Sequence, residues 1–204
     1  MFITDNVYLI DATKGSYAFA LHLDDGITLI DTSLPGRGPA IATELETHQL
    51  DDVKRILLTH HDVDHVGSAA WLQQHYGCDV FISATDMPYV LGSSKRHGVK
   101  RVIGALIKVR VPENLQTLPD GSIDGIQIVP TPGHTPGHTC YLWDGVLFAG
   151  DLLHLKDSRV TKPSPLMTWD AQQVDSSVAA LGDLAFQWVC PAHGEPVQTS
   201  HVNN

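Results

Sequence analysis

The residues that most constrain this chain lie between Ile56 and Ser68, where an apolar run is followed at once by polar side chains. Ile56, Leu57 and Leu58 predict a buried strand that ends near Thr59. Three histidines and two aspartates then fall within six residues: His60, His61, Asp62, Asp64 and His65. Burying such a group costs free energy unless a cation holds it together, and these are ligand types for zinc, iron and manganese. The alternative is a solvated polar loop, which the density of the cluster at a strand end disfavours.

Three further polar clusters follow predicted strands. His134 and His138 lie in a loop rich in proline and glycine, Asp151 follows an apolar run, and His193 lies in another Pro/Gly turn. A lone histidine after a strand is usually a cap or a surface residue. Four clusters of one chemical kind, all at strand ends, instead predict a shared metal site.

The rest of the chain alternates strand-rich and helical stretches in two halves. We expect two sheets packed together, with helices outside, in one domain spanning residues 1–204. Predicted strands are 7–10, 16–21, 27–30, 56–59, 78–82, 126–129, 139–142, 146–149 and 187–190, and predicted helices are 39–48, 66–76, 84–91 and 170–181.

Composition narrows the class of protein. A hydrophobic content of 43% supports a sizeable core, and the net charge of -10 argues against a general nucleic-acid binder. No stretch is long enough for a membrane span, and the first residues do not predict a signal peptide. Three cysteines in or beside apolar runs predict buried free thiols in a reducing compartment, so we expect a cytoplasmic protein. The oligomeric state stays open, a homodimer included.

In this order the four clusters resemble the metallo-β-lactamase superfamily, whose pattern is His-x-His-x-Asp-His, then a single His, a bridging Asp and a final His. The resemblance covers essentially the whole chain. It implies an α+β fold, the αββα four-layer sandwich with two mixed sheets, and a dinuclear metal site at one edge. The metal ligands that it implies are His60, Asp64, His65, His134, Asp151 and His193.

Asp62 departs from that pattern, because the family usually has its second histidine there. We assign His60, Asp62 and His134 to one ion and Asp64, His65 and His193 to the other, with Asp151 between them. His61 is expected to point away. Asp62 could instead support a ligand without touching the ion. The added carboxylate predicts a less electrophilic centre that takes two divalent ions, zinc first, with iron or manganese tolerated.

The resemblance implies a hydrolase that cleaves a small ester, lactone or thioester, with hydroxide held between the ions as the nucleophile. Asp64 would orient that hydroxide. His154 would contact the substrate carbonyl or protonate the leaving group, unless it is an exposed loop histidine. His138 would steady the loop of His134. The printed sequence ends soon after His193, which disfavours glutathione thioesters.

Residues 92–111 mix basic side chains with apolar ones at helical spacing. This predicts an amphipathic helix between the two halves, in the place where the superfamily often carries a lid. The lid would bind an acyl chain or a carboxylate; the alternative is a solvated basic face packed on the core.

Two other functions stay open. An iron-dependent oxidoreductase of the same fold is suggested by Asp62 and would need a separate electron donor. A non-catalytic metal- or ligand-binding module is disfavoured by the intact set of ligands.

Overall fold

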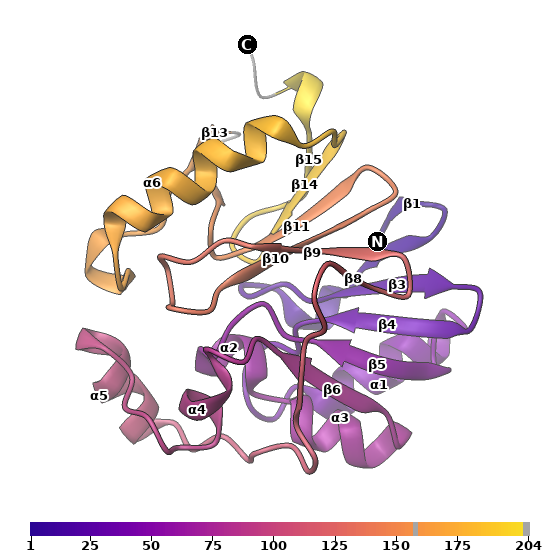
Figure 1. Cartoon of the computed structure of the whole chain (residues 1–204). Helices are drawn as coiled ribbons and strands as arrows, with labels where there is room; N and C mark the ends of the chain where they lie inside the picture. Colours follow the sequence, from indigo (N-terminus) through magenta and orange to yellow (C-terminus); the bar gives the residue numbers. More distant parts are fainter. Residues whose placement is uncertain (157–158, 202–204) are drawn as a thin grey trace.

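Two β-sheets lie face to face, and helices cover the outer face of each, in the computed structural model, which describes residues 1–156 and 159–201 (Figure 1). The first sheet has seven strands in sequence order: β1 (Phe2–Thr4), β2 (Val7–Leu9), β3 (Phe19–Leu23), β4 (Gly26–Ile30), β5 (Val53–Leu57), β6 (Asp79–Ile82) and β7 (Gln116–Thr117). Its first four strands pair antiparallel, and β4 to β7 pair parallel.

The second sheet has six strands, in the order β15 (Val197–Gln198), β14 (Trp188–Pro191), β11 (Val146–Gly150), β10 (Thr139–Trp143), β9 (Ile126–Pro130) and β8 (Ser122–Ile123). Only the β11–β14 pair is parallel among the described pairs of this sheet. A separate ribbon is formed by β12 (His154–Lys156) and β13 (Arg159–Thr161).

Six α-helices complete the described chain: α1 (Gly38–Thr47), α2 (Val63–Val66), α3 (Ala69–Tyr76), α4 (Met87–Val90), α5 (Gly98–Leu106) and α6 (Ala171–Ala180). Short 3-10 turns lie at η1 (Asp11–Thr13), η2 (Pro165–Met167), η3 (Leu181–Asp183) and η4 (Thr199–His201). α1 and α3 cover the first sheet, and α6 covers the second (Figure 1). The predicted αββα sandwich is confirmed.

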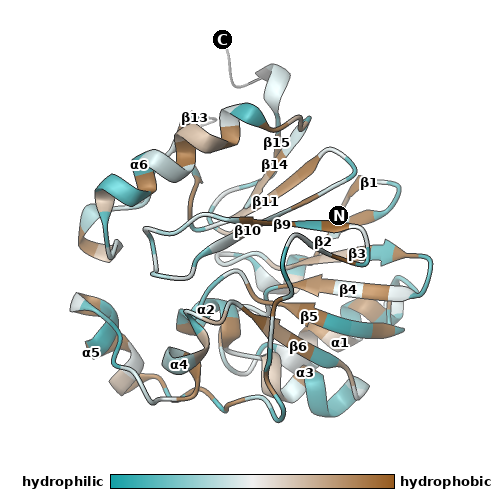
Figure 2. Cartoon of the chain, viewed as in Figure 1, coloured by the Kyte–Doolittle hydropathy of each residue, from teal (hydrophilic) through white to brown (hydrophobic). Residues whose placement is uncertain are grey.

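Burial on both faces explains the continuous apolar run before the polar cluster. Ile56 and Leu58 pack under the helices of the first sheet, whereas Leu57 points into the core between the two sheets. Successive side chains of a strand point to opposite faces, so a strand buried on both sides needs apolar residues throughout. Figure 2 shows such apolar residues along the central strands.

The topology brings the polar clusters to one edge. Strands β4, β5 and β6 run parallel, as do β11 and β14, so their carboxyl ends open toward the same rim of the sandwich. Each polar cluster follows the end of one of these strands or of β9. The chain therefore delivers its histidines and aspartates to one place.

Several predicted elements have different limits in the structure. The strand expected over 56–59 is β5, which begins at Val53 and ends at Leu57. The helix expected over 66–76 is two helices, separated at Ser68, which has a φ of -104° and a ψ of 1° and whose hydroxyl donates to the Leu34 carbonyl. The strand expected from Ser16 begins at Phe19, and the Ser16 hydroxyl donates to the Asp64 carbonyl. The helices expected over 84–91 and 92–111 shorten to α4 and α5. None of the helices in the described residues is long and apolar enough to cross a membrane.

Candidate metal site

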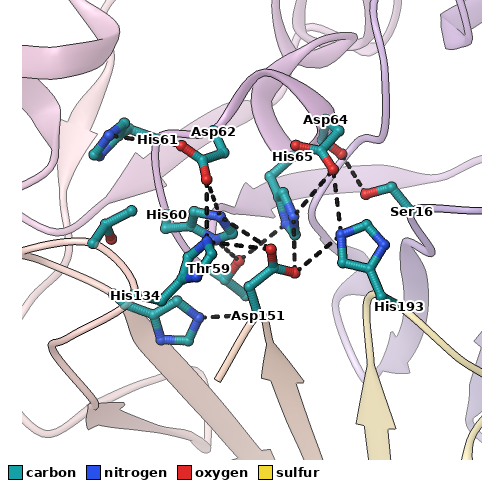
Figure 3. Close-up of polar contacts among 12 residues, drawn as sticks. Ser16, Thr59, His60, His61, Asp62, Asp64, His65, His134, Asp151 and His193 are labelled. Atoms are coloured by element: carbon teal, nitrogen blue, oxygen red, sulfur yellow. Dashed lines mark hydrogen bonds and ion pairs between the residues drawn. The ribbon is translucent and has the colours of Figure 1, made fainter. Parts of the chain in front are cut away.

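The polar side chains at the rim converge on one point between the two sheets (Figure 3). His60, Asp62, Asp64 and His65 come from the β5–α2 loop and α2, which continue the first sheet. His134 comes from the β9–β10 loop, and the loops after β11 and β14 carry the remaining two, Asp151 and His193. Both halves of the sandwich therefore contribute to the site.

The candidate ligand atoms form three groups, with the atoms of each group within 4.8 Å of one another. His60, Asp62, His134 and Asp151 make the first, Asp64, His65 and His193 make the second, and Asp151, His154 and His193 make the third. Apart from Asp151, which the sequence assignment placed between the ions, the first two groups have the members of the two predicted ligand sets. The roles of the individual residues as ligands remain a prediction.

Spacing within the first group fits a small divalent ion. His134 Nε2 lies 3.1 Å from Asp62 Oδ2 and 3.2 Å from Asp151 Oδ2, and His60 Nε2 lies 3.3 Å from Asp62 Oδ2. Ligands about 2.0–2.2 Å from a tetrahedral ion are about 3.3–3.6 Å apart. The side chains already stand near the separations that such an ion imposes.

Asp151 connects the two groups through its two oxygens. Its Oδ2 lies 3.2 Å from His134 Nε2, whereas its Oδ1 lies 3.3 Å from both His65 Nε2 and His193 Nε2. The carboxylate thus turns one oxygen to each group, as a residue shared by two ions must. Gly150 permits this placement, because its φ is +50° and a Cβ there would lie 2.8 Å from His138 Nε2.

Three of the histidines are oriented by hydrogen bonds at their other ring nitrogen. Nδ1 of His60 lies 3.0 Å from Thr59 Oγ1, Nδ1 of His65 lies 2.8 Å from Asp31 Oδ2, and Nδ1 of His193 lies 2.7 Å from the Gly15 carbonyl. A proton on Nδ1 leaves the lone pair of Nε2 free for a cation. The buried Nε2 atoms of His60 and His65 have no hydrogen-bond partner among the described residues.

The site attracts positive charge. Burial alone would raise the pKa of Asp62, but the His134 and His60 rings beside its carboxylate hold that pKa well below its ordinary value. Burial likewise opposes ionisation of Asp151, and the charges of His65 and His134 outweigh it and lower its pKa strongly. Two ionised carboxylates among buried Nε2 atoms suit a divalent cation.

His61 lies outside both groups, in the direction expected for a spacer residue (Figure 3). Its ring stacks on Tyr89 with centroids 4.4 Å apart, and its Nδ1 lies 2.8 Å from Asp86 Oδ2. Asp86 is fully buried and also accepts hydrogen bonds from the His61 and Gly137 backbone nitrogens and from Thr135 Oγ1. It therefore ties the loop of His60 to the loop of His134.

His138 lies behind the cluster rather than in it. Its Nε2 accepts a hydrogen bond from the Asp151 backbone nitrogen at 3.2 Å, and its Nδ1 lies 2.9 Å from Thr131 Oγ1. Burial lowers the pKa of His138 to about 3, so the ring is neutral and can accept that bond. It supports Asp151 as well as the loop that carries His134.

His154 stands at the open side of the second group. Its Nε2 lies 3.8 Å from Asp151 Oδ1, and it forms a third set of candidate ligand atoms with Asp151 and His193. The side chain is partly exposed, but its Nε2 is buried and has no hydrogen-bond partner among the described residues. Its role remains a proposal.

The segment predicted as a lid differs from expectation in how it is buried. Helix α5 contacts η2 across the opening of the site, but its apolar residues Val102 and Leu106 are exposed. Its buried residue is Lys100, whose Nζ lies 2.6 Å from Asp62 Oδ2 and 2.8 Å from His134 Nε2. The apolar stripe therefore does not pack on the core, and the Lys100 ammonium adds a positive charge beside Asp62 that the prediction of a less electrophilic centre did not include.

Sequence reasoning missed Asp31, Asp86 and Lys100. Asp31 follows the apolar strand β4, which is the same signal that identified Asp151 after β11. Asp86 has no local pattern around it. Lys100 was treated as one of several lid cations, because helical periodicity groups residues by polarity and predicts apolar burial.

The sequence model of the metallo-beta-lactamase superfamily matches residues 8–193. The chain belongs to the metallo-β-lactamase superfamily. The probable metallo-hydrolase YflN of Bacillus subtilis is 28% identical over 94% of this chain and 81% of its own length. The hydroxyacylglutathione hydrolase of Thiobacillus denitrificans is 32% identical over 90% of this chain, which spans 62% of that protein.

Solved structures of the superfamily share the fold. The protein TTHA1623, solved in a di-iron-bound form, aligns with a TM-score of 0.73 at 26% identity, covering 91% of this chain and 90% of its own. The BLEG-1 B3 metallo-beta-lactamase aligns with a TM-score of 0.77 at 22% identity over 96% of this chain and 95% of its own. At this identity, the similarity to BLEG-1 shows a shared fold and nothing more.

Proposed function

We propose that this member of the superfamily is a dinuclear metal-dependent hydrolase that cleaves a small ester, lactone or thioester. The observation that carries the proposal is the Asp151 carboxylate, which turns Oδ2 toward His134 and Oδ1 toward His65 and His193. One shared carboxylate between two ligand groups is the arrangement that places two ions close together.

Two bound divalent ions would supply a water of lowered pKa as nucleophile and Lewis acidity toward the substrate carbonyl. His60, Asp62 and His134 would hold one ion, and Asp64, His65 and His193 the other. Zinc suits this mixture of imidazole and carboxylate, and iron or manganese is compatible with it.

The chain's own residues would position and move protons. Asp64 is less buried than Asp62, and its Oδ2 lies 3.3 Å from His193 Nε2. From there it would accept a hydrogen bond from the attacking water and orient it. His154, beside Asp151 at the open side, would donate to the substrate carbonyl or to the leaving group.

Support for an acyl substrate comes from the relatives. Hydroxyacylglutathione hydrolases, by their name, hydrolyse an acylated glutathione, and they match 71% to 90% of this chain in the sequences from Thiobacillus denitrificans and Shewanella loihica. Esters, lactones and thioesters share a carbonyl that one ion can polarise.

An iron-dependent oxidoreductase is the second candidate, and Asp62 is the observation that favours it. A carboxylate beside two histidines is a ligand set that accepts iron as well as zinc. The structurally similar protein TTHA1623 was solved in a di-iron-bound form.

The test is a screen of matched esters, lactones and thioesters with protein whose metal content has been measured. Wild-type protein is expected to turn over at least one class, and Asp151→Ala to lose at least about a thousandfold in kcat/KM, because neither ion keeps its shared ligand. An Asp144→Ala variant, in the exposed β10–β11 turn, controls for handling. Full metal loading with no turnover of any class would contradict the hydrolase, and iron with an absorbance that changes on reduction would favour the oxidoreductase.

A further inference from the structure

Helix α5 is buried in the opposite sense to an ordinary amphipathic helix. Lys100 is 6% exposed, whereas Val102 is 59% and Leu106 is 80% exposed. A surface helix normally packs its apolar side chains inward and leaves lysine in water, since burying an ammonium costs free energy. Such an inversion requires a favourable interaction at the buried end of Lys100.

That interaction lies inside the candidate metal site. The Lys100 ammonium is 2.6 Å from Asp62 Oδ2 and donates to the His134 carbonyl at 3.1 Å. Helix α5 thus places the Lys100 ammonium beside the first group of candidate ligands.

A second cation of the same segment lies beside it. Arg96 donates through Nη2 to the His61 carbonyl at 2.8 Å, and its buried Nε has no partner among the described residues. Gly104 makes room for this guanidinium, because a Cβ there would lie 2.7 Å from Arg96 Nη1. A buried donor without a partner favours an acceptor from a ligand.

Two pockets meet at Lys100. One is lined by Arg96 and Lys100 together with Asp62, Asp64, Ile103 and Met167. The other continues from Lys100 along a more aromatic wall that includes Tyr89, Met167 and Trp169. A ligand at this junction would meet cations on one side and apolar surface on the other.

Charge balance indicates the sign of that ligand. The charged residues that line the first pocket are Asp62, Asp64, Arg96 and Lys100. Once ions engage the two carboxylates, the two cations are left without a carboxylate in that pocket, where an anion is then favoured.

We propose that Lys100 and Arg96 form a subsite for an anionic group of the substrate, so that the preferred ester, lactone or thioester carries a carboxylate close to the scissile carbonyl. This inference rests on the proposed hydrolase function and names the class of substrate within it. Lys100 acts here as a specificity-determining residue.

The test compares an anionic and a neutral probe of equal chain length in two independent measurements. Calorimetry on metal-loaded protein measures the affinities of succinate and butyrate, so that the ions' own affinity for one carboxylate is common to both. Kinetics compare mono-4-nitrophenyl succinate with 4-nitrophenyl butyrate, after subtraction of the enzyme-free rate of each. Metal content is measured for every protein used.

Wild-type protein is expected to favour the anionic probe by roughly ten- to a hundredfold in both measurements, the range of a charge-assisted hydrogen bond. Lys100→Met should bring that ratio down by at least about tenfold, and Lys100→Arg should restore much of it. Lys95→Met removes the same charge from an exposed position of the same segment and should leave the ratio unchanged.

The outcomes separate the two proposals. Turnover of both esters without a preference for the anion, or a preference that Lys100→Met and an Arg96→Met variant both leave intact, would overturn the subsite and keep the hydrolase. Tighter binding of succinate that depends on Lys100, without turnover of either ester, would keep the subsite and count against ester hydrolysis. A loss of thermal stability in Lys100→Met with an unchanged ratio would show that Lys100 only latches the lid to Asp62.

Discussion

At the scale of single residues, the candidate site depends on side chains outside the groups of candidate ligands. Asp31 is buried with a φ of +61°, an uncommon conformation for a residue other than glycine. Its carboxylate accepts hydrogen bonds from the backbone nitrogen and hydroxyl of Thr59 and from His65 Nδ1. One carboxylate thereby fixes the strand end before His60 and the ring of His65.

Asp31→Asn should lower metal affinity about ten- to a hundredfold, because the amide cannot accept at both positions and His65 loses its charged partner. Competition with a chromophoric chelator measures the affinity. Asp25→Asn, which removes an exposed carboxylate paired with Arg55, serves as the matched control. An affinity equal to that of wild type would show that His65 is held without Asp31.

The positions of the candidate ligands could be predicted from the sequence because each one follows a strand, and parallel strands end at one rim. His60, Asp64, His65, His134, Asp151 and His193 all lie at the rim where that argument places them. The buried position of Lys100 could not be predicted from the sequence, because it depends on which side of the short helix α5 packs inward. Side-chain periodicity assigns apolar faces inward and cannot foresee a buried ion pair.

At the scale of elements, helix α6 supports the loop that carries His134. The backbone nitrogens of Trp169 and Asp170 donate to the carbonyls of His134 and Gly133 just before the helix begins. Gly133 has a φ of +137°, and a Cβ there would lie 2.4 Å from the Val174 nitrogen. The start of α6 and the His134 loop therefore pack as one unit.

Asp170 caps α6 by accepting hydrogen bonds from the backbone nitrogens of Gln172 and Gln173. Asp170→Ala should lower the free energy of unfolding by about 1 kcal/mol, the usual value of such a cap. Urea denaturation of metal-free protein measures the change. Asp175→Ala, which removes only an exposed pair with Lys162, should cost less, and an equal loss in both variants would contradict the capping argument.

Element boundaries were less predictable than element types. The strands at 27–30 and 146–149 have nearly the predicted limits, because both are continuous apolar runs bounded by turn residues. The helix expected from Val66 is interrupted at Ser68, whose hydroxyl donates to the Leu34 carbonyl, a contact between residues far apart in the chain. Local sequence patterns do not predict contacts of this kind.

At the scale of the whole molecule, the candidate site joins the two halves of the sandwich. His60, Asp62 and His65 belong to the first half, while His134, Asp151 and His193 belong to the second. An ion held by both halves binds the folded chain and not the unfolded one. Metal binding should therefore appear directly in stability.

Removal of metal with a chelator should lower the melting temperature by about 10 °C when free ion had exceeded its dissociation constant about a thousandfold. Differential scanning calorimetry with and without added zinc checks this. Asp151→Ala should show a much smaller difference between its two forms. If neither the chelator nor added zinc changed the melting temperature of the wild-type protein, the two halves would not be joined by an ion.

We propose that the rim of the sandwich holds two divalent ions that share Asp151. Elemental analysis of protein purified without chelators or added metal tests it most directly. We predict about two ions per chain, zinc foremost, and about one or fewer in Asp151→Ala. A wild-type chain that takes up no divalent metal, even after reconstitution, would contradict the account.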